Sequence, residues 1–173
     1  VNVTPAVGNE YTLSTCQLDF CLPAKFDLKY VDKDGEKKTP VVLHRAILGS
    51  LDRFMAYILE ETKGALPTWL SPTQVKVIPV NPELHSEYGE EITSLLKEND
   101  IRAELDNRNE KLGYRLREAQ TEKVPYTLIL GDQEKENNTI SYRLFGKKDT
   151  TTISKEDFLS MIEEEIRTKA LRK

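Results

Sequence analysis

The sequence has little of what marks secreted, metal-rich or membrane proteins. Only two cysteines, two histidines and one tryptophan occur among its 173 residues. Cys16 and Cys21 are too few for a disulfide framework, and their spacing fits no common zinc motif, so we expect reduced cysteines in a cytoplasmic protein. No apolar run approaches the roughly 20 residues of a membrane-spanning helix, and the N-terminal stretch VNVTPAVGNEY lacks the parts of a signal peptide. Because the first residue is not methionine, we also expect a piece of a longer protein.

An excess of basic residues is missing as well. Lys and Arg number 25 against 29 Asp and Glu, which gives a formal net charge of −4. A general nucleic-acid binder usually carries a strong positive balance, so any polyanionic partner has to be met by a local patch. With 31% charged and 38% hydrophobic residues, the composition is otherwise that of an ordinary globular protein.

The first third of the chain has the pattern of β structure followed by one helix. Residues 11–43 are rich in β-formers, and the turn DKDG is typical of a hairpin. Apolar residues then recur at helical spacing, which predicts an amphipathic helix that Gly64 ends. The apolar stripe of this helix consists of Ile47, Leu51, Phe54 and Ile58. The segment ALPTWLSPTQ interrupts the pattern, and we expect two domains, residues 1–66 and 67–173.

In the second domain, strand patterns alternate with helix patterns. The expected strands are QVKVIPV, IRAELD, PYTLILG, TISYRLFG and TTTIS, and the expected helices are HSEYGEEITSLLKEND, KLGYRLREAQTEK and a last one that Ser154 and Asp157 cap. Such alternation implies right-handed crossovers and a mixed, mostly parallel sheet with helices on both faces. PYTLILG is apolar enough to be the central strand. The fold class is therefore α/β.

The stretch VVLHRAILGSLDRF combines a rare histidine with two arginines where a strand meets a helix. If residues 45–58 form one helix, three small residues and a cation share the face opposite the apolar stripe. That face consists of Ala46, Gly49, Ser50 and Arg53. A flat ring fits such a floor, with Arg53 stacked on it or reaching a phosphate. The alternative is plain packing with Arg53 in solvent, and His44 is then a structural residue, because one imidazole cannot hold zinc alone.

A second polar stretch, LDNRNEKLGYRLREAQ, follows the end of an expected strand. The helix that begins there carries three cations, Lys111, Arg115 and Arg117, and helix N-termini favour phosphate. Ligands of open α/β sheets usually bind beyond the carboxyl ends of the strands, where this loop lies. The alternative is a set of solvated surface charges. We expect Tyr114 to pack into the core, with stacking on a base as the alternative.

Beyond these local patterns, HRAILGSLDRF resembles motif 3 of the class II aminoacyl-tRNA synthetases, in the form found in the threonyl-tRNA synthetase family. STCQLDF, PTWLSPTQV, IRAELDNRNEKLGYRLREAQ and KVPYTLILGDQE follow the same family's order and spacing. The resemblance implies that residues 1–66 are the end of an antiparallel class II catalytic core, with a β-hairpin and the motif 3 helix. It implies that residues 67–173 are a class IIa anticodon-binding domain. The parent enzyme is expected to be a homodimer.

The resemblance also assigns residues to the site for ATP with Mg²⁺ and for threonine. It implies that Arg53 is catalytic, stacking on adenine and touching the γ-phosphate, that Gly49 and Ser50 lie beneath the adenosine, and that Thr15 and Gln17 face the aminoacyl-adenylate. His44 corresponds to one zinc ligand, whose partner ligands lie upstream and are absent here. That zinc would bind the threonine hydroxyl, and a site built for a hydroxyl rejects the isosteric valine. Because the other wall of the site is missing, we expect the chain alone to be inactive.

For the second domain the resemblance implies contacts with the anticodon loop of tRNA(Thr). The residues it implies are Asn109, Arg117, Glu134 and Arg143. We expect Arg108 and Lys111 to add phosphate contacts, with solvated side chains as the alternative. We expect Glu134 and Arg143 to flank a hairpin-like turn that presents both to one ligand. Unpaired loop bases are open to such readout, whereas bases in an A-form stem are not.

Three functions remain in competition at this point. The first is part of an enzyme that activates threonine and transfers it to the 3′ end of tRNA(Thr). The second is a stand-alone, non-catalytic tRNA-binding module that has kept the anticodon-binding fold. The third is a small-molecule-binding α/β domain without RNA, which the acidic composition favours.

Overall fold

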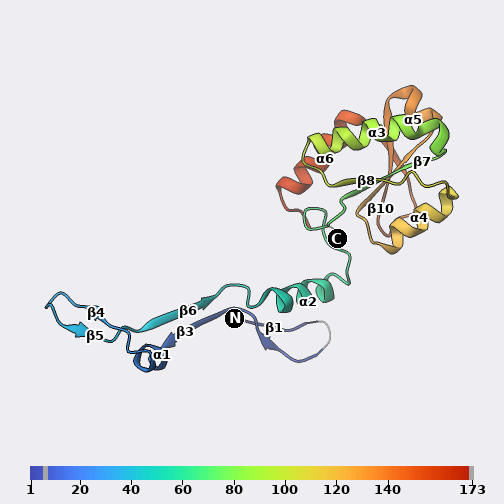
Figure 1. Ribbon diagram of the computed structural model, residues 1–173. Helices are drawn as coiled ribbons and strands as arrows, with labels where there is room; N and C mark the ends of the chain where they lie inside the picture. Colours follow the sequence, from blue (N-terminus) through green and yellow to red (C-terminus); the bar gives the residue numbers. More distant parts are fainter. Residues whose placement is uncertain (6–7, 172–173) are drawn as a thin grey trace. The chain divides into compact units, whose positions relative to one another are not determined.

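The computed structural model describes residues 1–5 and 8–171, and the chain divides into two units, Val1–Gly64 and Ala65–Lys173 (Figure 1). The first unit consists of short β pairs and two helices, and the second consists of a five-stranded sheet with helices around it. None of the helices in the described ranges is long and apolar enough to cross a bilayer.

Short antiparallel pairs make up most of the first unit. Its strands are β1 (Asn2–Val3), β2 (Tyr11–Thr12), β3 (Thr15–Asp19), β4 (Tyr30–Val31), β5 (Lys37–Lys38) and β6 (Val42–Ala46). β4 and β5 pair on either side of DKDG, so the predicted hairpin is confirmed, and β3 pairs with β6. A helix, α1 (Cys21–Lys25), interrupts the expected β region. It begins where the Asp19 carboxylate accepts hydrogen bonds from the amides of Cys21 and Leu22, at 2.8 and 3.0 Å.

The longer helix of the first unit, α2 (Leu51–Glu61), starts later than its apolar pattern suggests. It is capped by Ser50, so the prediction of one helix over residues 45–58 is wrong. Gly49 precedes the helix with a φ of +72°, in the left-handed region that favours glycine. A Cβ on Gly49 would also lie 2.8 Å from the carbonyl oxygen of Leu13. Gly49 is therefore required by a turn and a close backbone approach, and not by a flat helix face. Gly64 closes the helix as predicted, because its amide donates to the Leu59 carbonyl (2.8 Å).

Few apolar side chains of the first unit are covered. Leu13 is 8% exposed, whereas Leu18, Ile47 and Leu51 are 59%, 69% and 74% exposed. α2 contributes no buried residue, although its apolar residues lie on one stripe. Within the first unit, the apolar stripe of α2 is therefore only partly covered.

The second unit is built on one mixed sheet with strand order β11-β10-β9-β7-β8. The strands are β7 (Val75–Pro79), β8 (Ala103–Leu105), β9 (Tyr126–Leu130), β10 (Thr139–Leu144) and β11 (Thr151–Ser154). β7 pairs in parallel with β8 and β9, and β10 is antiparallel to β9 and β11. Only β10 thus runs against the others, which confirms a mixed, mostly parallel sheet. β9 is the central strand, as its apolar sequence predicts.

Helices cover both faces of this sheet. α3 (Pro82–Glu98) and α6 (Lys155–Arg167) lie on one face, and α4 (Leu112–Thr121) lies on the other (Figure 1). The core is formed by residues of α3, α6 and the strands, including Val75, Ile92, Leu128, Phe158 and Ile162, all 0% exposed. The Ser154 hydroxyl accepts from the Asp157 amide at 3.0 Å, which confirms the predicted start of α6.

One element of the second unit was not predicted. Residues Asp132–Asn137 form α5, where a hairpin-like turn was expected. Glu134 lies at the third position of α5, and its Oε2 accepts from the Gly131 amide at 2.9 Å. A side chain that folds back onto the preceding amide stabilises a helix start. This local hydrogen bond, rather than apolar periodicity, accounts for the helix.

Candidate nucleic-acid interface

The candidate interface lies on the face of the sheet that carries α4. Lys76 of β7, Thr127 of β9 and Arg143 of β10 lie side by side in register, so their side chains share one face. Lys76 forms an ion pair at the C-terminal end of α4 (2.5 Å), which identifies this face as the one that α4 covers. Gln120 of α4 accepts a hydrogen bond from the Gly146 amide, just beyond β10, at 3.0 Å. α4 therefore lies alongside the strand that carries Arg143.

The loop between β8 and α4 is closed by an ion-pair cluster. The Arg108 guanidinium donates to both carboxylate oxygens of Asp106, at 2.9 and 2.7 Å, and also donates to Glu118 of α4. Asp106 is only 4% exposed, and the hydrogen bonds from Arg108 hold the pKa of its carboxyl below the ordinary value. The hydrogen bond from Arg108 likewise lowers the pKa of Glu118. The guanidinium that was expected to contact phosphate is thus already held by two carboxylates.

Arg115 holds the loop between β8 and α4 through hydrogen bonds to its carbonyl groups. Its side chain was expected among the cations of the helix start, but it is 0% exposed, so this prediction is wrong. The guanidinium donates to the carbonyl oxygens of Asp106, Glu110 and Val80, at 3.0, 3.1 and 3.3 Å. Burial lowers the pKa of Arg115. The residue therefore satisfies carbonyl groups of two loops and is not available to a ligand.

The side chains of Asn109, Lys111, Tyr114 and Arg117 are exposed on the loop and on α4. The prediction that Tyr114 packs into the core is wrong, because it is 54% exposed while its neighbour Arg115 takes the position facing the sheet. Lys111 stands at the N-cap of α4 without a side-chain cap, and the first turn holds no acidic residue. The N–H groups of that turn can therefore donate hydrogen bonds to an anion, which the helix dipole also favours.

Glu134 and Arg143 lie on the same face, although not in a hairpin. Glu134 reaches β10 through its Oε1, which accepts from the Ser141 hydroxyl at 2.6 Å. Ser141 and Arg143 are two residues apart on β10, so both side chains point to one side of the strand. Arg143 donates to the Thr150 hydroxyl at 3.3 Å, and its buried Nε has no partner in the part of the chain that the structure describes. The structure thus brings the Glu134 carboxylate next to the strand position that precedes Arg143 on the same side, whereas Asn109 and Arg117 lie on the loop before α4 and on α4 itself.

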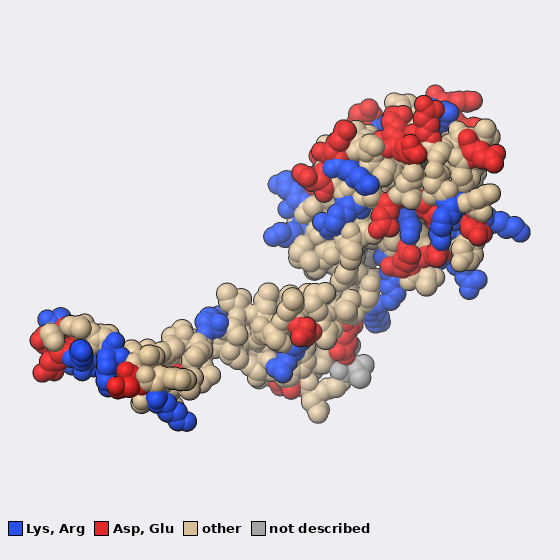
Figure 2. Space-filling model, viewed as in Figure 1, with Lys and Arg blue, Asp and Glu red and all other residues tan. Residues whose placement is uncertain are grey.

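The acidic balance of the chain is concentrated elsewhere. Figure 2 shows acidic side chains gathered over the region where Figure 1 places α3 and α5. α3 alone carries Glu83, Glu87, Glu90, Glu91 and Glu98. Near α4, Glu118 and Asp106 share the single cation Arg108, whereas Lys111 and Arg117 are exposed. The exposed cations of this region are therefore Lys111 and Arg117, on the loop before α4 and on α4.

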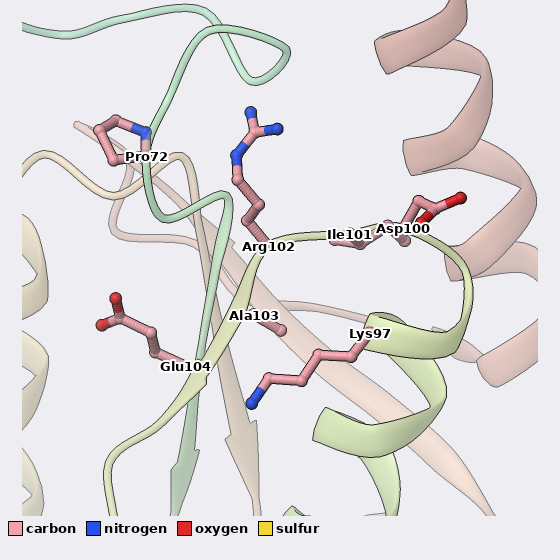
Figure 3. A pocket seen from close by; sticks show the side chains of 7 residues that line it. All are labelled: Pro72, Lys97, Asp100, Ile101, Arg102, Ala103 and Glu104. Atoms are coloured by element: carbon pink, nitrogen blue, oxygen red, sulfur yellow. The ribbon is translucent and has the colours of Figure 1, made fainter.

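A small cavity of about 410 Å³ at the edge strand β8 is a different feature (Figure 3). Its lining includes the cations Lys97 and Arg102 and the carboxylates of Asp100 and Glu104. The Arg102 guanidinium donates to the carbonyls of Ser71 and Trp69, at 3.0 and 2.9 Å. The charges in this cavity are balanced, and they indicate no particular class of ligand.

In the first unit, His44 is oriented by Asp19. Its Nε2 donates to the Asp19 carboxylate at 3.0 Å, and two backbone amides hold that carboxylate in turn. Hydrogen bonds from Leu22 and Cys21, and then from His44, keep the pKa of Asp19 below its ordinary value. The other ring nitrogen of His44 is left as an acceptor, an arrangement common for metal ligands. Across the described ranges, no three His, Cys, Asp or Glu side chains converge to hold a metal ion, so the fit extends to one ligand only.

Two of the residues expected around ATP, Thr15 and Gln17, lie on β3, which pairs with the strand that carries His44. Gln17 is directly opposite His44, and Thr15 is opposite Ala46, all on β3 and β6. Arg53, in the first turn of α2, has its guanidinium carbon 6.0 Å from the centre of the Tyr11 ring. Gly49 and Ser50 form the turn and cap before α2 and do not form a helix floor. The side chains of Thr15, Gln17, His44 and Arg53 are all exposed.

Sequence patterns missed the carboxylates that hold these sites. Asp19 lies at the end of β3 and Asp106 directly follows β8, and their spacing to His44 and Arg108 carries no recognised motif. Asp106 lies two residues before Arg108, which is a weak local signal for a hydrogen-bonded turn. Glu118 and Ser141 have no local signal at all, because their partners lie ten and seven residues away in other elements.

Comparisons with known proteins agree with this geometry. The family model described as anticodon binding domain matches residues 74–165, and that described as tRNA synthetase class II core domain (G, H, P, S and T) matches residues 2–62. The chain is 52% identical over 172 residues to threonine–tRNA ligase from Staphylococcus carnosus, and 49% identical to that from Oceanobacillus iheyensis. These alignments cover 99% of this chain and 27% of each relative, so the chain spans about a quarter of their length.

Solved structures give the same picture. The RNA binding domain of threonyl-tRNA synthetase from Cryptosporidium parvum Iowa II matches 94% of this chain with a TM-score of 0.79 and 30% identity, over 41% of its own length. Prolyl-tRNA synthetase from Cryptosporidium parvum matches 94% of this chain and 36% of its own, with a TM-score of 0.75 and 17% identity, and shares the fold alone. Because the matched domain covers more than half of the residues, this chain belongs to the anticodon binding domain family, and its residues 2–62 match the tRNA synthetase class II core.

Proposed function

We propose that this chain is part of a threonyl-tRNA synthetase, which activates threonine with ATP and Mg²⁺ and transfers it to the 3′ end of tRNA(Thr). In this proposal, residues 1–66 carry one wall of the ATP and threonine site, and residues 67–173 bind the anticodon loop. The parent is a homodimeric cytoplasmic enzyme, and the chain alone does not catalyse. The observation that carries the proposal is the match of residues 74–165 to the anticodon binding domain family, together with the exposed Asn109 and Arg117 and the hydrogen bond that holds Glu134 beside the strand of Arg143.

The chemistry of these four side chains suits unpaired bases. Asn109 is exposed and offers both a donor and an acceptor, which a base edge can pair with. Arg143 is partly buried and its guanidinium donates to Thr150; such a group can also donate to a carbonyl oxygen of a base or to a phosphate oxygen. Glu134 can accept from the Watson–Crick edge of guanine, with its carboxylate held in place by Gly131 and Ser141. We assign Glu134 to specificity and Lys111 to phosphate contact.

For the first unit we propose that Arg53 stacks on adenine and contacts the γ-phosphate of ATP. Tyr11 already packs against the Arg53 guanidinium, which keeps the planar group extended from α2. Thr15 and Gln17 face the aminoacyl-adenylate from β3, beside His44. Gly49 and Ser50 shape the turn beneath the adenosine, in place of the helix floor suggested by periodicity.

We also propose that His44 is one ligand of a zinc ion whose remaining ligands come from other parts of the synthetase. When bound, zinc would supply the Lewis-acid contact to the threonine amino and hydroxyl groups. The residues of this chain hold the imidazole in one tautomer, through the hydrogen bond from Nε2 to Asp19. The exposed apolar residues of the first unit favour an enzyme part over a stand-alone tRNA-binding module, because a module would leave them uncovered.

The test is fluorescence anisotropy of a labelled tRNA(Thr) anticodon stem-loop titrated with the chain, beside a loop whose central G is replaced. We expect the cognate loop to bind more tightly by about 1 kcal/mol or more. Glu134→Ala should reduce this preference, whereas Lys111→Ala should weaken both loops alike. Equal affinity for the two loops together with a steep salt dependence would indicate phosphate contact only and would refute anticodon reading.

A further inference from the structure

We propose that Arg108 is a positioning residue for the anticodon contact of Asn109 and does not itself contact phosphate. Together with Asp106 and Glu118 it forms a clamp, and this clamp holds the loop of residues 106–111 in the conformation that presents Asn109. The inference rests on the proposed function, and it changes the role that the family resemblance suggests for Arg108.

The clamp engages the Nε and Nη2 donors of the Arg108 guanidinium. Asp106 takes two of the guanidinium donors of Arg108 in a bidentate pair, at 2.9 and 2.7 Å, and Glu118 takes a further bond. The cluster contains two carboxylates and one cation, so it carries a net charge of −1. A phosphate brought to Arg108 would be repelled by both carboxylates. Bidentate Arg–carboxylate pairs are among the strongest hydrogen-bonded contacts in proteins, so the exchange is unfavourable.

Neighbouring backbone bonds show what the clamp holds. The Arg108 amide donates to Asp106 Oδ1 at 3.3 Å, and the Glu110 amide donates to the Arg108 carbonyl at 2.8 Å. The buried Arg115 guanidinium fixes the carbonyls of Asp106 and Glu110, on either side of Asn109. Asn109 therefore sits between two restrained residues, and its own side chain makes no hydrogen bond within the described chain.

Lys111 provides the contrast that makes the inference testable. It is an exposed cation of the same loop, and the structure gives its side chain no carboxylate partner in the ranges it describes. A cation that neutralises one phosphate raises the salt dependence of binding, by about 0.7–0.9 in the slope of log K against log salt. A clamp residue changes affinity without this contribution. The salt slope thus separates the two roles.

The experiment is anisotropy of the cognate anticodon stem-loop with the 173-residue chain, at several salt concentrations, for Arg108→Gln, Lys111→Gln, Asn109→Ala and the Arg108→Gln/Asn109→Ala double variant. We expect Arg108→Gln to weaken binding about tenfold, which corresponds to about 1.4 kcal/mol, with the salt slope unchanged. Lys111→Gln should lower the slope by about 0.7–0.9. The double variant should bind little worse than either single one, because Arg108 acts through Asn109.

The two possible roles of Arg108, phosphate contact and clamp, predict opposite effects of Glu118→Gln on the affinity for RNA. If Arg108 contacts phosphate, removal of a competing carboxylate strengthens RNA binding. If Arg108 is a clamp, Glu118→Gln loosens the loop and weakens binding, and we expect this result. Arg167→Gln is the matched control, because Arg167 is also paired with a carboxylate, that of Glu164, but lies on α6 and should leave binding unchanged.

Hydrogen exchange of the free chain tests the clamp without RNA. Arg108→Gln should speed exchange of the amides at residues 108–110 by a larger factor than exchange of the amides of the central strand β9, because the loop opens locally, while loss of the partner of the buried Asp106 lowers the stability of the whole second unit. A lower salt slope for Arg108→Gln, losses that multiply with those of Asn109→Ala, or unchanged exchange would each overturn the inference. If the unsubstituted chain does not distinguish cognate from altered loops, the proposed function fails, whereas the exchange experiment still decides whether the clamp exists.

Discussion

Replacement of Arg115 by methionine tests how much a buried guanidinium stabilises the second unit. Arg115 is 0% exposed, and its three hydrogen bonds end on carbonyl oxygens of Asp106, Glu110 and Val80. A hydrogen bond from a charged donor contributes about 1.5–3 kcal/mol, and a buried acceptor that loses its partner costs about 1–3 kcal/mol. Methionine fills most of the space and removes the cost of burying a charge, which offsets part of the loss. We therefore expect Arg115→Met to lower the free energy of unfolding by about 3 kcal/mol.

The assay is urea unfolding followed by tryptophan fluorescence. Trp69 is the single tryptophan of the sequence and lies in the second unit, so its signal reports that unit. Arg117→Met is the matched control, because Arg117 lies two residues away on α4 and is exposed, and its replacement should change stability by about 0.5 kcal/mol or less. A loss for Arg115→Met no larger than that of the control would refute the reasoning that these carbonyls depend on Arg115.

Three further predictions concern stability. Burial raises the pKa of Tyr88 to about 12, and the carboxylates of Glu91, Glu134 and Glu156 add to this shift. The contribution of neutral Tyr88 to the free energy of unfolding is therefore full below pH 10 and is lost as the pH rises from 10 to about 12. Tyr88→Phe should make the urea midpoint depend less on pH across that range. Gly49→Ala should destabilise the first unit by about 1–2 kcal/mol, because φ is positive and the added Cβ would lie 2.8 Å from the Leu13 carbonyl oxygen. Gly113→Ala, whose Cβ would meet nothing within 4 Å, should instead stabilise the second unit by up to about 1 kcal/mol. Thermal unfolding followed by circular dichroism measures both. Glu134→Gln should lower the stability of the second unit by about 1–2 kcal/mol, because both carboxylate oxygens accept hydrogen bonds; an unchanged urea midpoint would contradict this.

The alternation of the second domain made its architecture predictable. Strands such as PYTLILG and helices such as the one begun by Ser154 each carry a strong local pattern, and the structure confirms the central strand and the cap. α5 escaped prediction because six polar residues have no apolar stripe, and its start depends on a hydrogen bond from the Gly131 amide to Glu134. α1 was missed for a similar reason, since Asp19 caps it within a β-rich segment.

The motif 3 segment shows where periodicity misleads. Ile47, Leu51, Phe54 and Ile58 have helical spacing, yet residues before Ser50 belong to β6 and a turn. A spacing rule cannot detect that the chain passes within van der Waals contact of the Leu13 carbonyl, which Gly49 alone permits. In α4, likewise, the pattern could not tell which of two neighbours, Tyr114 or Arg115, faces the sheet.

The amino-acid sequence by itself determined the α/β class, the mostly parallel sheet and the family, because apolar periodicity and motif order are properties of neighbouring residues. It also named the polar residues of the α4 face. Only the tertiary structure decided which cations are free, because Arg108 and Arg115 meet carboxylates and carbonyls from separate elements. The number of charged residues can be read from the sequence. Whether one of these charges is available to a ligand depends on the partners that folding brings within hydrogen-bonding distance.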